Sequence, residues 1–258
     1  GWFAPVTLQG KRVIQDIWKQ DTAWDQAVSP DIATRWEKVR ADLARIPSVE
    51  LGRFVGPLPP SCELHAFCDA SQSAAAAVVY CRKVENGTMS CCLLFAKTRL
   101  APVKPSQTIP RLELVALELG VNLLSFVEDQ LRLPIAKRVV WSDSQCALQW
   151  VQKARIATKF VQNRVERILS FKNVERRYVR SSDNPADLPS RGCSLDTLKG
   201  TQSWWVGPSW LSQDEKKWPP DPMGGVVIEP EPENVILAFG TCETGISTAS
   251  KHRPFCQA

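Results

Sequence analysis

The 258-residue chain lacks the features that mark membrane-spanning, secreted and zinc-binding proteins. No uninterrupted apolar run approaches the roughly 20 residues that a bilayer helix requires, so a membrane span is not expected. No signal-peptide pattern opens the chain, and it begins at Gly1 without an initiator Met, so we expect a piece of a longer product. No CxxC pair occurs among its nine cysteines, which argues against a zinc knuckle and a thioredoxin motif.

The cysteine pattern indicates a reduced protein. The cysteines are odd in number, and Cys91 and Cys92 are adjacent, so a framework of paired disulfides is not expected. Near the C-terminus, Cys242, His252 and Cys256 supply three soft ligands, one fewer than a structural zinc site normally takes. We therefore expect a reducing compartment, which favours the cytoplasm, and no zinc site in this segment.

Basic residues outnumber acidic ones, and the excess is concentrated in the middle of the chain. Hydrophobic residues at 44% and charged residues at 23% are typical of a soluble globular protein. The formal net charge is +5, and residues 51–220 carry 23 basic against 15 acidic side chains. A surplus of this size suits a polyanionic partner without identifying one.

Apolar periodicity divides the chain into a helical segment, a mixed α/β region and an irregular tail. Residues 1–50 repeat apolar side chains at three- and four-residue intervals, and Ser29-Pro30-Asp31 is a typical helix start. After a loop rich in Pro and Gly, the order becomes βββ-α-β-α-α-β-α, which predicts a mixed sheet covered by helices. The predicted strands span residues 63–71, 74–84, 88–100, 137–143 and 174–180, and the predicted helices span residues 109–131, 144–152 and 158–171, with a last turn at 184–192.

The C-terminal part is rich in tryptophan and then in Pro, Glu and Gly. Of the ten tryptophans, four precede residue 40 and four lie between residues 204 and 218. This distribution suggests either that the two flanks pack on each other or that they form a partner interface. We expect residues 221–258 to be largely unordered, or to begin a unit that is cut short.

Four acidic residues lie at strand ends or in a helix start, where α/β sheets place their chemistry. Asp69 lies within the first predicted strand, Asp143 closes VVWSD, Asp187 follows the last strand, and Glu113 lies in the opening turns of the long helix. Each alone fits an ordinary role as a strand end, a helix cap or a complement to a helix N-terminus. Together they favour a shared cation, because an Asp in an apolar strand is costly unless it is paired, and converging carboxylates suit Mg²⁺.

Four segments carry a family resemblance. HAFCDAS, PRLELVA, WSDSQCALQW and NPADLPSRG, in this order, resemble the signature segments of a ribonuclease H domain, with Bel/Pao-type LTR retrotransposon polyproteins the most similar in wording. GWFAPVTLQGKRVIQDIWKQDTAWD is similar to the segment that joins reverse transcriptase to ribonuclease H, and SWWVGPSWL to the segment that leads toward integrase. The resemblance covers about residues 1–218.

The resemblance implies a fold and a division into three parts. The implied fold is α/β: a ribonuclease H-like mixed five-stranded sheet with helices on both faces, preceded by a small helical segment. Residues 1–58 would be a helical connection from the end of reverse transcriptase. Residues 59–200 would form the ribonuclease H-like domain, and residues 201–258 a Trp-rich linker and a largely unordered tail toward integrase.

The resemblance also implies Mg²⁺-dependent hydrolysis of the RNA strand of RNA/DNA hybrids. The family acids fall on Asp69, Glu113, Asp143 and Asp187, which would hold two Mg²⁺ ions roughly 3.5–4 Å apart, with Mn²⁺ as a substitute. Asp69 would bridge the ions, Glu113 and Asp143 would hold one, and Asp187 the other. The implied products are a 5′-phosphate and a 3′-hydroxyl.

The implied partners are the hybrid and the reverse transcriptase and integrase portions of the same polyprotein. No membrane and no small-molecule cofactor is expected, and the implied location is the cytoplasm or a retroelement particle. A hybrid duplex carries 2′-hydroxyls on one strand and displays them in a shallow minor groove, which gives a basis for substrate choice. The residues predicted to contact nucleic acid are Ser71, Arg111, Ser144, Gln145, Lys153 and Arg155.

These contacts are predicted from position. Ser144 and Gln145 directly follow Asp143. In retroviral relatives, the polar residues at the equivalent positions contact nucleic acid. Arg111, two residues before Glu113, is placed to contact phosphate. The basic stretch from residue 153 to residue 167 suits a duplex backbone, or is simply a solvated helix face. Trp141 and Trp150 are predicted to be core residues rather than stacking platforms.

One position departs from the family pattern. Many ribonucleases H have a His shortly before the last Asp, and Tyr178 stands near that place, whereas His65 and His252 lie elsewhere. The departure implies slower turnover with metal binding retained, because the metal itself activates the attacking water.

Two alternatives stay open: an active nuclease, and an interaction module, either a retroelement remnant or host-adopted, that binds nucleic acid or a protein partner without cutting. A DDE transposase ranks below both, because its Glu follows the last strand and Glu113 precedes VVWSD.

Overall fold

The computed structural model describes residues 1–220 apart from 53–55, 57, 60, 86, 105 and 154–157. The tail 221–258, with the soft ligands predicted not to bind zinc, lies outside the described residues. The same holds for Arg155, one of the residues predicted to contact nucleic acid.

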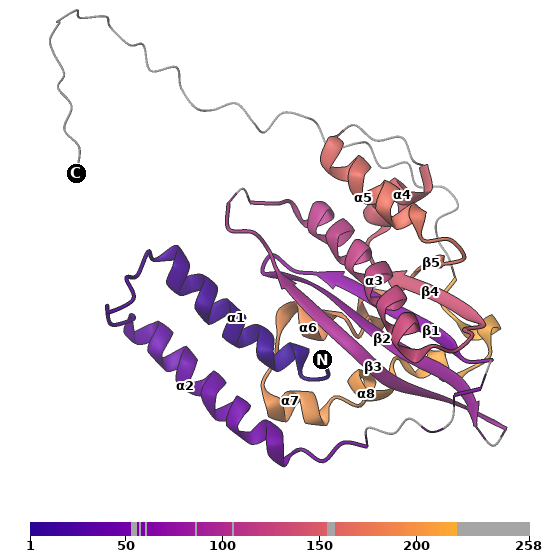
Figure 1. Cartoon of the computed structure of the whole chain (residues 1–258), viewed down its shortest axis with the longest axis horizontal. Coiled ribbons are helices and arrows are strands. Elements are labelled where there is room, and N and C mark those ends of the chain that lie inside the picture. The colour runs from indigo at the N-terminus through magenta and orange to yellow at the C-terminus, as the bar shows by residue number, and fades with distance from the viewer. Residues whose placement is uncertain are drawn as a thin grey trace, which may run out of the picture.

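The centre of the fold is a five-stranded mixed sheet in the order β3-β2-β1-β4-β5 (Figure 1). The first three strands form an antiparallel meander, and β1, β4 and β5 run parallel to one another. The predicted mixed five-stranded sheet is thus confirmed. The strands are β1 Glu63–Ala70, β2 Ala74–Glu85, β3 Thr88–Leu100, β4 Lys137–Ser142 and β5 Glu175–Tyr178.

Helices cover both faces of the sheet, as predicted, because successive strand residues point to opposite sides. Leu64, Ala66 and Cys68 of β1 enter a core beneath α3, α4 and α5, whereas Phe67 enters a second core beneath α1 and the C-terminal helices (Figure 1). The helices of the first core are α3 Ile109–Leu131, α4 Gln145–Lys153 and α5 Lys159–Ser170. The other helices are α1 Ala4–Lys19, α2 Pro30–Arg45, α6 Asp187–Arg191, α7 Leu195–Gly200 and α8 Gln202–Val206, with short 3₁₀ turns at Ile46–Ser48, Ser181–Asp183, Ser209–Ser212 and Glu215–Lys217.

Helix α3 lies unusually close to the central strand. Pro110 occupies its first turn, where a missing N–H is harmless, and Arg132 ends it in the left-handed conformation. A Cβ added at Gly120 would lie 2.1 Å from the sulfur of Cys68, so no larger residue fits there without movement. This close approach holds the middle of α3 against the end of β1.

Helix α1 and the residues just before it cover the outer edge of β3 with side-chain donors. Trp2 Nε1 donates to the backbone oxygen of Leu94 at 2.8 Å, and Lys11 Nζ donates to that of Thr98 at 3.0 Å. Gln15 Nε2 donates to the backbone oxygen of Ala101 at 2.7 Å, just beyond the strand. An edge strand otherwise presents unpaired carbonyls that another chain can pair with, and α1 satisfies these.

The C-terminal segment after α6 completes the second core. Trp204 is fully buried and donates from Nε1 to the backbone oxygen of Trp2 at 3.0 Å, so the two Trp-rich flanks do contact each other. Trp210 and Trp218 pack against the buried ring of Trp141. The predicted core position of Trp141 is confirmed. The boundaries at residues 58 and 200 stay predictions.

The cysteines and the apolarity of the helices bear on the predicted reduced state and on a membrane span. Every cysteine within the described part of the chain is a free thiol, in line with the predicted reduced state. None of the helices that the structure describes combines the length and the apolarity needed to cross a bilayer.

Candidate functional site

The four acids predicted as ligands come from four elements that meet at one end of the sheet. Asp69 is the penultimate residue of β1, and Asp143 directly follows β4. Because β1 and β4 are parallel and Cys68 is paired with Ser142, these two acids leave their strands side by side. Glu113 lies in the opening turns of α3, and Asp187 is the first residue of α6.

All four acids take part in electrostatic interactions with at least one other acid of the group. Burial raises the pKa of Asp69 to about 6, and the charges of Asp143 and Asp187 add to that effect. Burial also raises the pKa of Glu113, with further contributions from Asp143 and Asp69. Like charges that disfavour each other's ionised form are typical of a site that binds a cation or handles protons.

Each of the four carboxylates has a donor from its own chain. Ser190 donates to Asp69, and Ser144 donates to Glu113. Ser181 donates to Asp143 at 2.6 Å, and Arg191 pairs with Asp187. Sequence reasoning missed Ser181, Ser190 and Arg191, although all three lie in the stretch RSSDNPADLPSR that contains Asp187.

A hydrogen-bonded loop holds α6 against the end of β1. The buried Asn184 donates from Nδ2 to the backbone oxygen of Cys68 at 2.9 Å, next to Asp69, and its Oδ1 accepts from the N–H of Ala186 at 3.1 Å. Ser71 donates to the backbone oxygen of Ser190 at 2.7 Å. Asp187 therefore does not cap the helix; its carboxylate pairs with Arg191, while Asn184 forms the turn.

The donor set suits a hard divalent cation, because carboxylate oxygens are the ligands that Mg²⁺ prefers. Burial is the main cause of the raised pKa values of Asp69 and Glu113, and the neighbouring carboxylates add to it, so a bound cation would favour the charged form of both groups. As the side chains stand, however, no three His, Cys, Asp or Glu residues within the described ranges are arranged around a common metal position. The carboxylates are turned toward their serine and arginine donors instead.

Three of the residues predicted to contact nucleic acid are close to the acids in the chain: Ser71 comes two residues after Asp69, Arg111 two residues before Glu113, and Ser144 directly after Asp143. Ser144 caps α4, since its Oγ accepts from the N–H of Ala147 at 3.1 Å, and Gln145 begins that helix. Lys153 is exposed at the end of α4. The guanidinium of Arg111 lies 5.4 Å from the ring centre of Phe160. Their roles in binding remain predictions.

Part of the predicted basic stretch has a structural partner. Arg167 forms an ion pair with Glu118 of α3 at 2.9 Å, and Arg164 lies 3.5 Å from the same carboxylate. Arg164 also stacks on Phe160, 3.6 Å from the ring centre. These two arginines tie α5 to α3, so they are not simply a solvated face.

His65 and Tyr178 both lie in the sheet rather than among the acids. His65 is fully buried, and its Nδ1 accepts from Trp141 Nε1 at 3.2 Å while Nε2 lies 3.0 Å from Glu63. Burial lowers the pKa of His65, so the neutral ring that donates to Glu63 fits this position. Tyr178 ends β5 beside Ser142, and the loop that follows sends Ser181 to Asp143.

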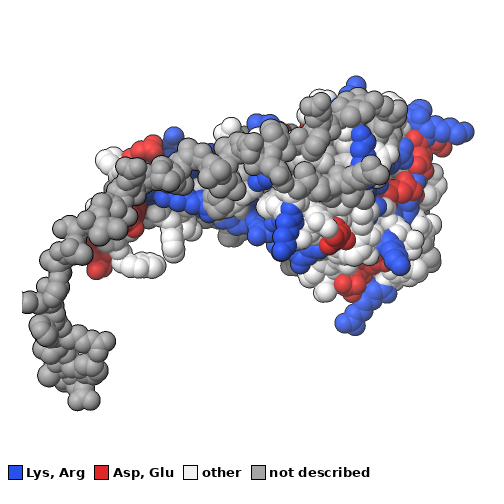
Figure 2. Space-filling view, turned by 90° about the horizontal axis from the view of Figure 1, so that it is seen from above, with Lys and Arg blue, Asp and Glu red and all other residues white. Residues whose placement is uncertain are grey.

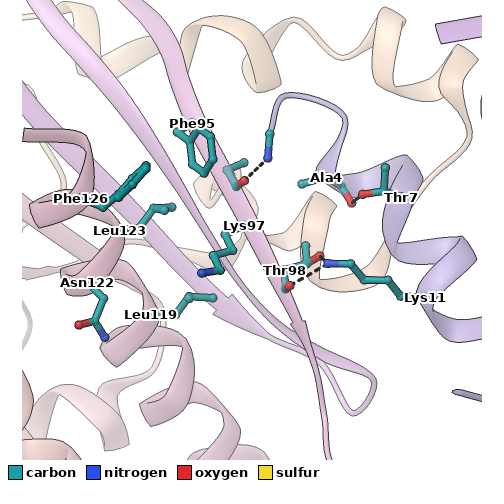
Figure 3. A pocket seen from close by; sticks show the side chains of 12 residues that line it. Ala4, Thr7, Lys11, Phe95, Lys97, Thr98, Leu119, Asn122, Leu123 and Phe126 are labelled. Atoms are coloured by element: carbon teal, nitrogen blue, oxygen red, sulfur yellow. Dashed lines mark hydrogen bonds between the residues drawn. The ribbon is translucent and has the colours of Figure 1, made fainter. Parts of the chain in front are cut away.

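The described part of the chain has further hollows away from the acids. A cavity of about 320 Å³ lies along β3, and Figure 3 shows that strand running between α1 and α3. Phe95, Leu123 and Phe126 give it apolar walls, and Lys11 and Lys97 add positive charge. Figure 2 shows Lys and Arg spread along the visible face among Asp and Glu rather than gathered in one patch.

Comparison with known proteins identifies the family. The model of the Pao retrotransposon-like RNaseH-like domain matches residues 1–144, more than half of the chain. A search of curated proteins gave no match.

Solved structures that resemble the chain include ribonucleases H. One is RNase H1 from Halobacterium salinarum, with 11% identity over 49% of this chain and 90% of that one and a TM-score of 0.33. Another is LC11-RNase H1, isolated from compost, in complex with an RNA/DNA hybrid, with 16% identity over 49% and 91% of the chains and a TM-score of 0.35. A third is the protease-reverse transcriptase of prototype foamy virus, with 12% identity over 66% of this chain and 21% of that one and a TM-score of 0.33.

At these TM-scores, the assignment rests on the matched family and on the mixed sheet with helices on both faces. The predicted resemblance is confirmed by that match: the chain belongs to the Pao retrotransposon-like RNaseH-like domain family.

Proposed function

We propose that this chain is a ribonuclease H that hydrolyses the RNA strand of RNA/DNA hybrids with two Mg²⁺ ions. The observation that carries the proposal is the meeting of Asp69, Glu113, Asp143 and Asp187 at one end of the sheet, where their charges act on one another. The family of the chain and the hybrid bound by the compost enzyme support the choice of substrate.

Asp69, Glu113, Asp143 and Asp187 would hold the ions, for which Mn²⁺ is the expected substitute. When bound, such ions supply an activated water and stabilise the leaving oxygen of the phosphodiester. Asp69 is best placed to serve both ions, because it leaves the central strand between Asp143 and α6. The serine hydroxyls orient the carboxylates, and α3 and α6 hold them at fixed positions relative to β1.

Nucleic acid would approach over the same end of the sheet. Gln145 and Lys153 belong to α4, and Arg111 belongs to α3. The residues proposed to contact nucleic acid also include Ser71, Ser144 and Arg155. Phosphate contacts from cations position a duplex, and hydroxyl and amide side chains suit the 2′-hydroxyls of its RNA strand. In a polyprotein, reverse transcriptase would supply the hybrid, and integrase would follow the tail.

The test is cleavage of a labelled RNA/DNA hybrid by the purified chain with Mg²⁺, with Mn²⁺ and with EDTA. We expect RNA fragments that carry 5′-phosphates with either metal, and none with EDTA. Asp69→Asn and Asp143→Asn should each reduce the rate at least 100-fold, because each removes a proposed ligand, whereas the exposed pair variant Asp183→Asn should cut normally. Intact hybrid under both metals would overturn the proposal.

One observation favours the alternative of an interaction module that does not cut. The acids are paired with their own chain's donors, and within the described ranges no three of them surround a metal position. Such a module predicts salt-sensitive hybrid binding without metal-dependent products. The cleavage assay therefore separates the two functions.

A further inference from the structure

We propose that Arg191 acts as a tethered counter-cation for the acidic site, competing with the metal for Asp187 and setting the metal affinity of the chain. The inference rests on the proposed function, because it concerns the binding of the same ions. It goes beyond that function by assigning a role to a basic residue that is not a ligand.

The position of Arg191 follows from α6. Asp187 and Arg191 are four residues apart on one helix, so their side chains lie on the same face. The guanidinium pairs with the Asp187 carboxylate through Nε. Its charge also interacts favourably with Asp69 and Asp143, so one cation serves three of the four acids.

The backbone around Arg191 is fixed by α1, which keeps the guanidinium within reach of the acids. Arg12 donates to the backbone oxygen of Arg191 at 3.1 Å. Gly192 adopts a φ of 79°, and a Cβ there would lie 2.9 Å from the side-chain nitrogen of Gln9 and 3.2 Å from the backbone oxygen of Pro5. Any other residue would be both strained and crowded, so the chain turns at this glycine while held against α1.

The side chain itself is free to move away. Arg191 is 67% exposed and its carboxylate partner 42%, and exposed ion pairs are weak because water and salt screen them. A divalent ion with several carboxylate ligands can therefore displace the guanidinium from Asp187. The displaced cation stays anchored by α1 near the site, where its repulsion continues to weaken metal binding.

The proposed competition predicts the direction in which the metal affinity changes when the charge of Arg191 is removed. An Arg is charged at every pH at which the protein is folded, so its competition with metal does not depend on its protonation. Removing the charge should strengthen metal binding, whereas a residue that merely holds α6 in place would weaken metal binding when removed. The direction of the change thus separates the two roles.

Isothermal titration of the full chain with Mn²⁺, without nucleic acid, tests the inference. Arg191→Gln should lower the dissociation constant by about three- to tenfold, since one unit charge near a divalent ion is removed. Arg191→Lys keeps the charge and should stay within about twofold of the wild type. Arg180→Gln is the matched control, because Arg180 forms a similar exposed ion pair with Asp183 and not with the four acids.

The outcomes distinguish this inference from the proposed function. If Arg191→Gln does not fold, as judged by circular dichroism, Arg191→Met provides the same test. Binding by the wild type with unchanged or weaker binding by the charge-removing variants overturns the role of Arg191 and leaves the nuclease proposal standing. Equal strengthening in Arg180→Gln also overturns it, because the effect would then be general surface charge. No heat with either the wild type or the variants would overturn both proposals.

Discussion

At the scale of single residues, Asp69 is the costliest group in the site. It is 6% exposed in a strand whose other side chains are largely apolar, and burial together with Asp143 and Asp187 raises its pKa to about 6. Ser190, which is fully buried, offsets part of this cost through its hydrogen bond. A buried carboxylate without a bound cation lowers the stability of the native chain, which is typical of residues that are kept for a function.

The raised pKa of Asp69 gives a stability prediction with a defined sign. Between about pH 4 and pH 6, the metal-free native chain retains a proton that the unfolded chain has released, so stability falls as the pH rises. By pH 7 the loss amounts to about 3 kcal/mol. Asp69→Asn stays neutral and accepts the same hydrogen bond, so we expect it to melt at a higher temperature than the wild type at pH 7.5 in EDTA.

Thermal melts from pH 3.5 to pH 7.5 check this expectation. The difference between Asp69→Asn and the wild type should shrink to nothing at the acid end, where both side chains are neutral. Ser182→Ala, in the exposed part of the same loop, serves as the control and should show no pH-dependent difference. A lower melting temperature for Asp69→Asn at pH 7.5 would contradict the proposed cost of the buried charge.

The four acids could be predicted from the sequence, whereas the serine and arginine side chains that donate hydrogen bonds to them could not. Asp69, Asp143 and Asp187 are recognisable because each lies at or after a strand end, and Glu113 because it opens a long helix. Hydrogen bonds from Ser181 and Ser190 depend on loop geometry that has no periodic signature, so no sequence pattern marks them.

At the scale of elements, α1 packs on the ribonuclease H-like sheet and helps to stabilise it. Its buried face includes Val6 and Leu8, and Lys11 of the helix and Trp2 just before it donate to outer carbonyls of β3. It also fixes the end of α6, and thereby the neighbourhood of Asp187, through Arg12. The periodicity of residues 1–50 predicted the helices α1 and α2, but an apolar stripe does not say which surface it covers, so their packing was not predictable.

A fragment experiment tests this role of α1. We expect residues 59–220 alone to aggregate or to lose a cooperative melt, because β3 becomes an open edge and buried side chains worth about 1.5–3 kcal/mol each lose their contacts. Residues 1–220, which retain every described element, should melt cooperatively. Size-exclusion chromatography and calorimetry of the two fragments make the comparison. Cooperative melting of 59–220 within a few degrees of 1–220 would contradict the account.

The strands show why the rest of the fold was predictable. β2 reads AAAAVVYCRKVE, rich in small and β-branched residues, and β3 follows after a turn at Gly87, whose φ of 76° suits glycine. The predicted strand and helix boundaries agree with the structure to within a few residues, because strong periodicity and turn residues coincide along this part of the chain.

At the scale of the whole molecule, two cores on opposite faces of one sheet bring the acids together. The first core positions α3 and therefore Glu113, and the second positions α6 and therefore Asp187. Asp69 and Asp143 lie between them at the ends of neighbouring strands. A single site thus depends on packing from nearly the whole described chain, including the tryptophans at positions 204, 210 and 218.

Anomalous diffraction from a crystal of the chain soaked in Mn²⁺ would show whether the four acids hold metal together. We expect manganese peaks enclosed by the carboxylates of Asp69, Glu113, Asp143 and Asp187, with Asp69 shared by both ions. In this metal-bound state, Arg191 should no longer pair with Asp187. Carboxylates that turn toward the ions should exchange their hydrogen bonds from serine hydroxyls for bonds to manganese. Peaks elsewhere, or none with the acids still held by Ser190, Ser144, Ser181 and Arg191, would contradict the account.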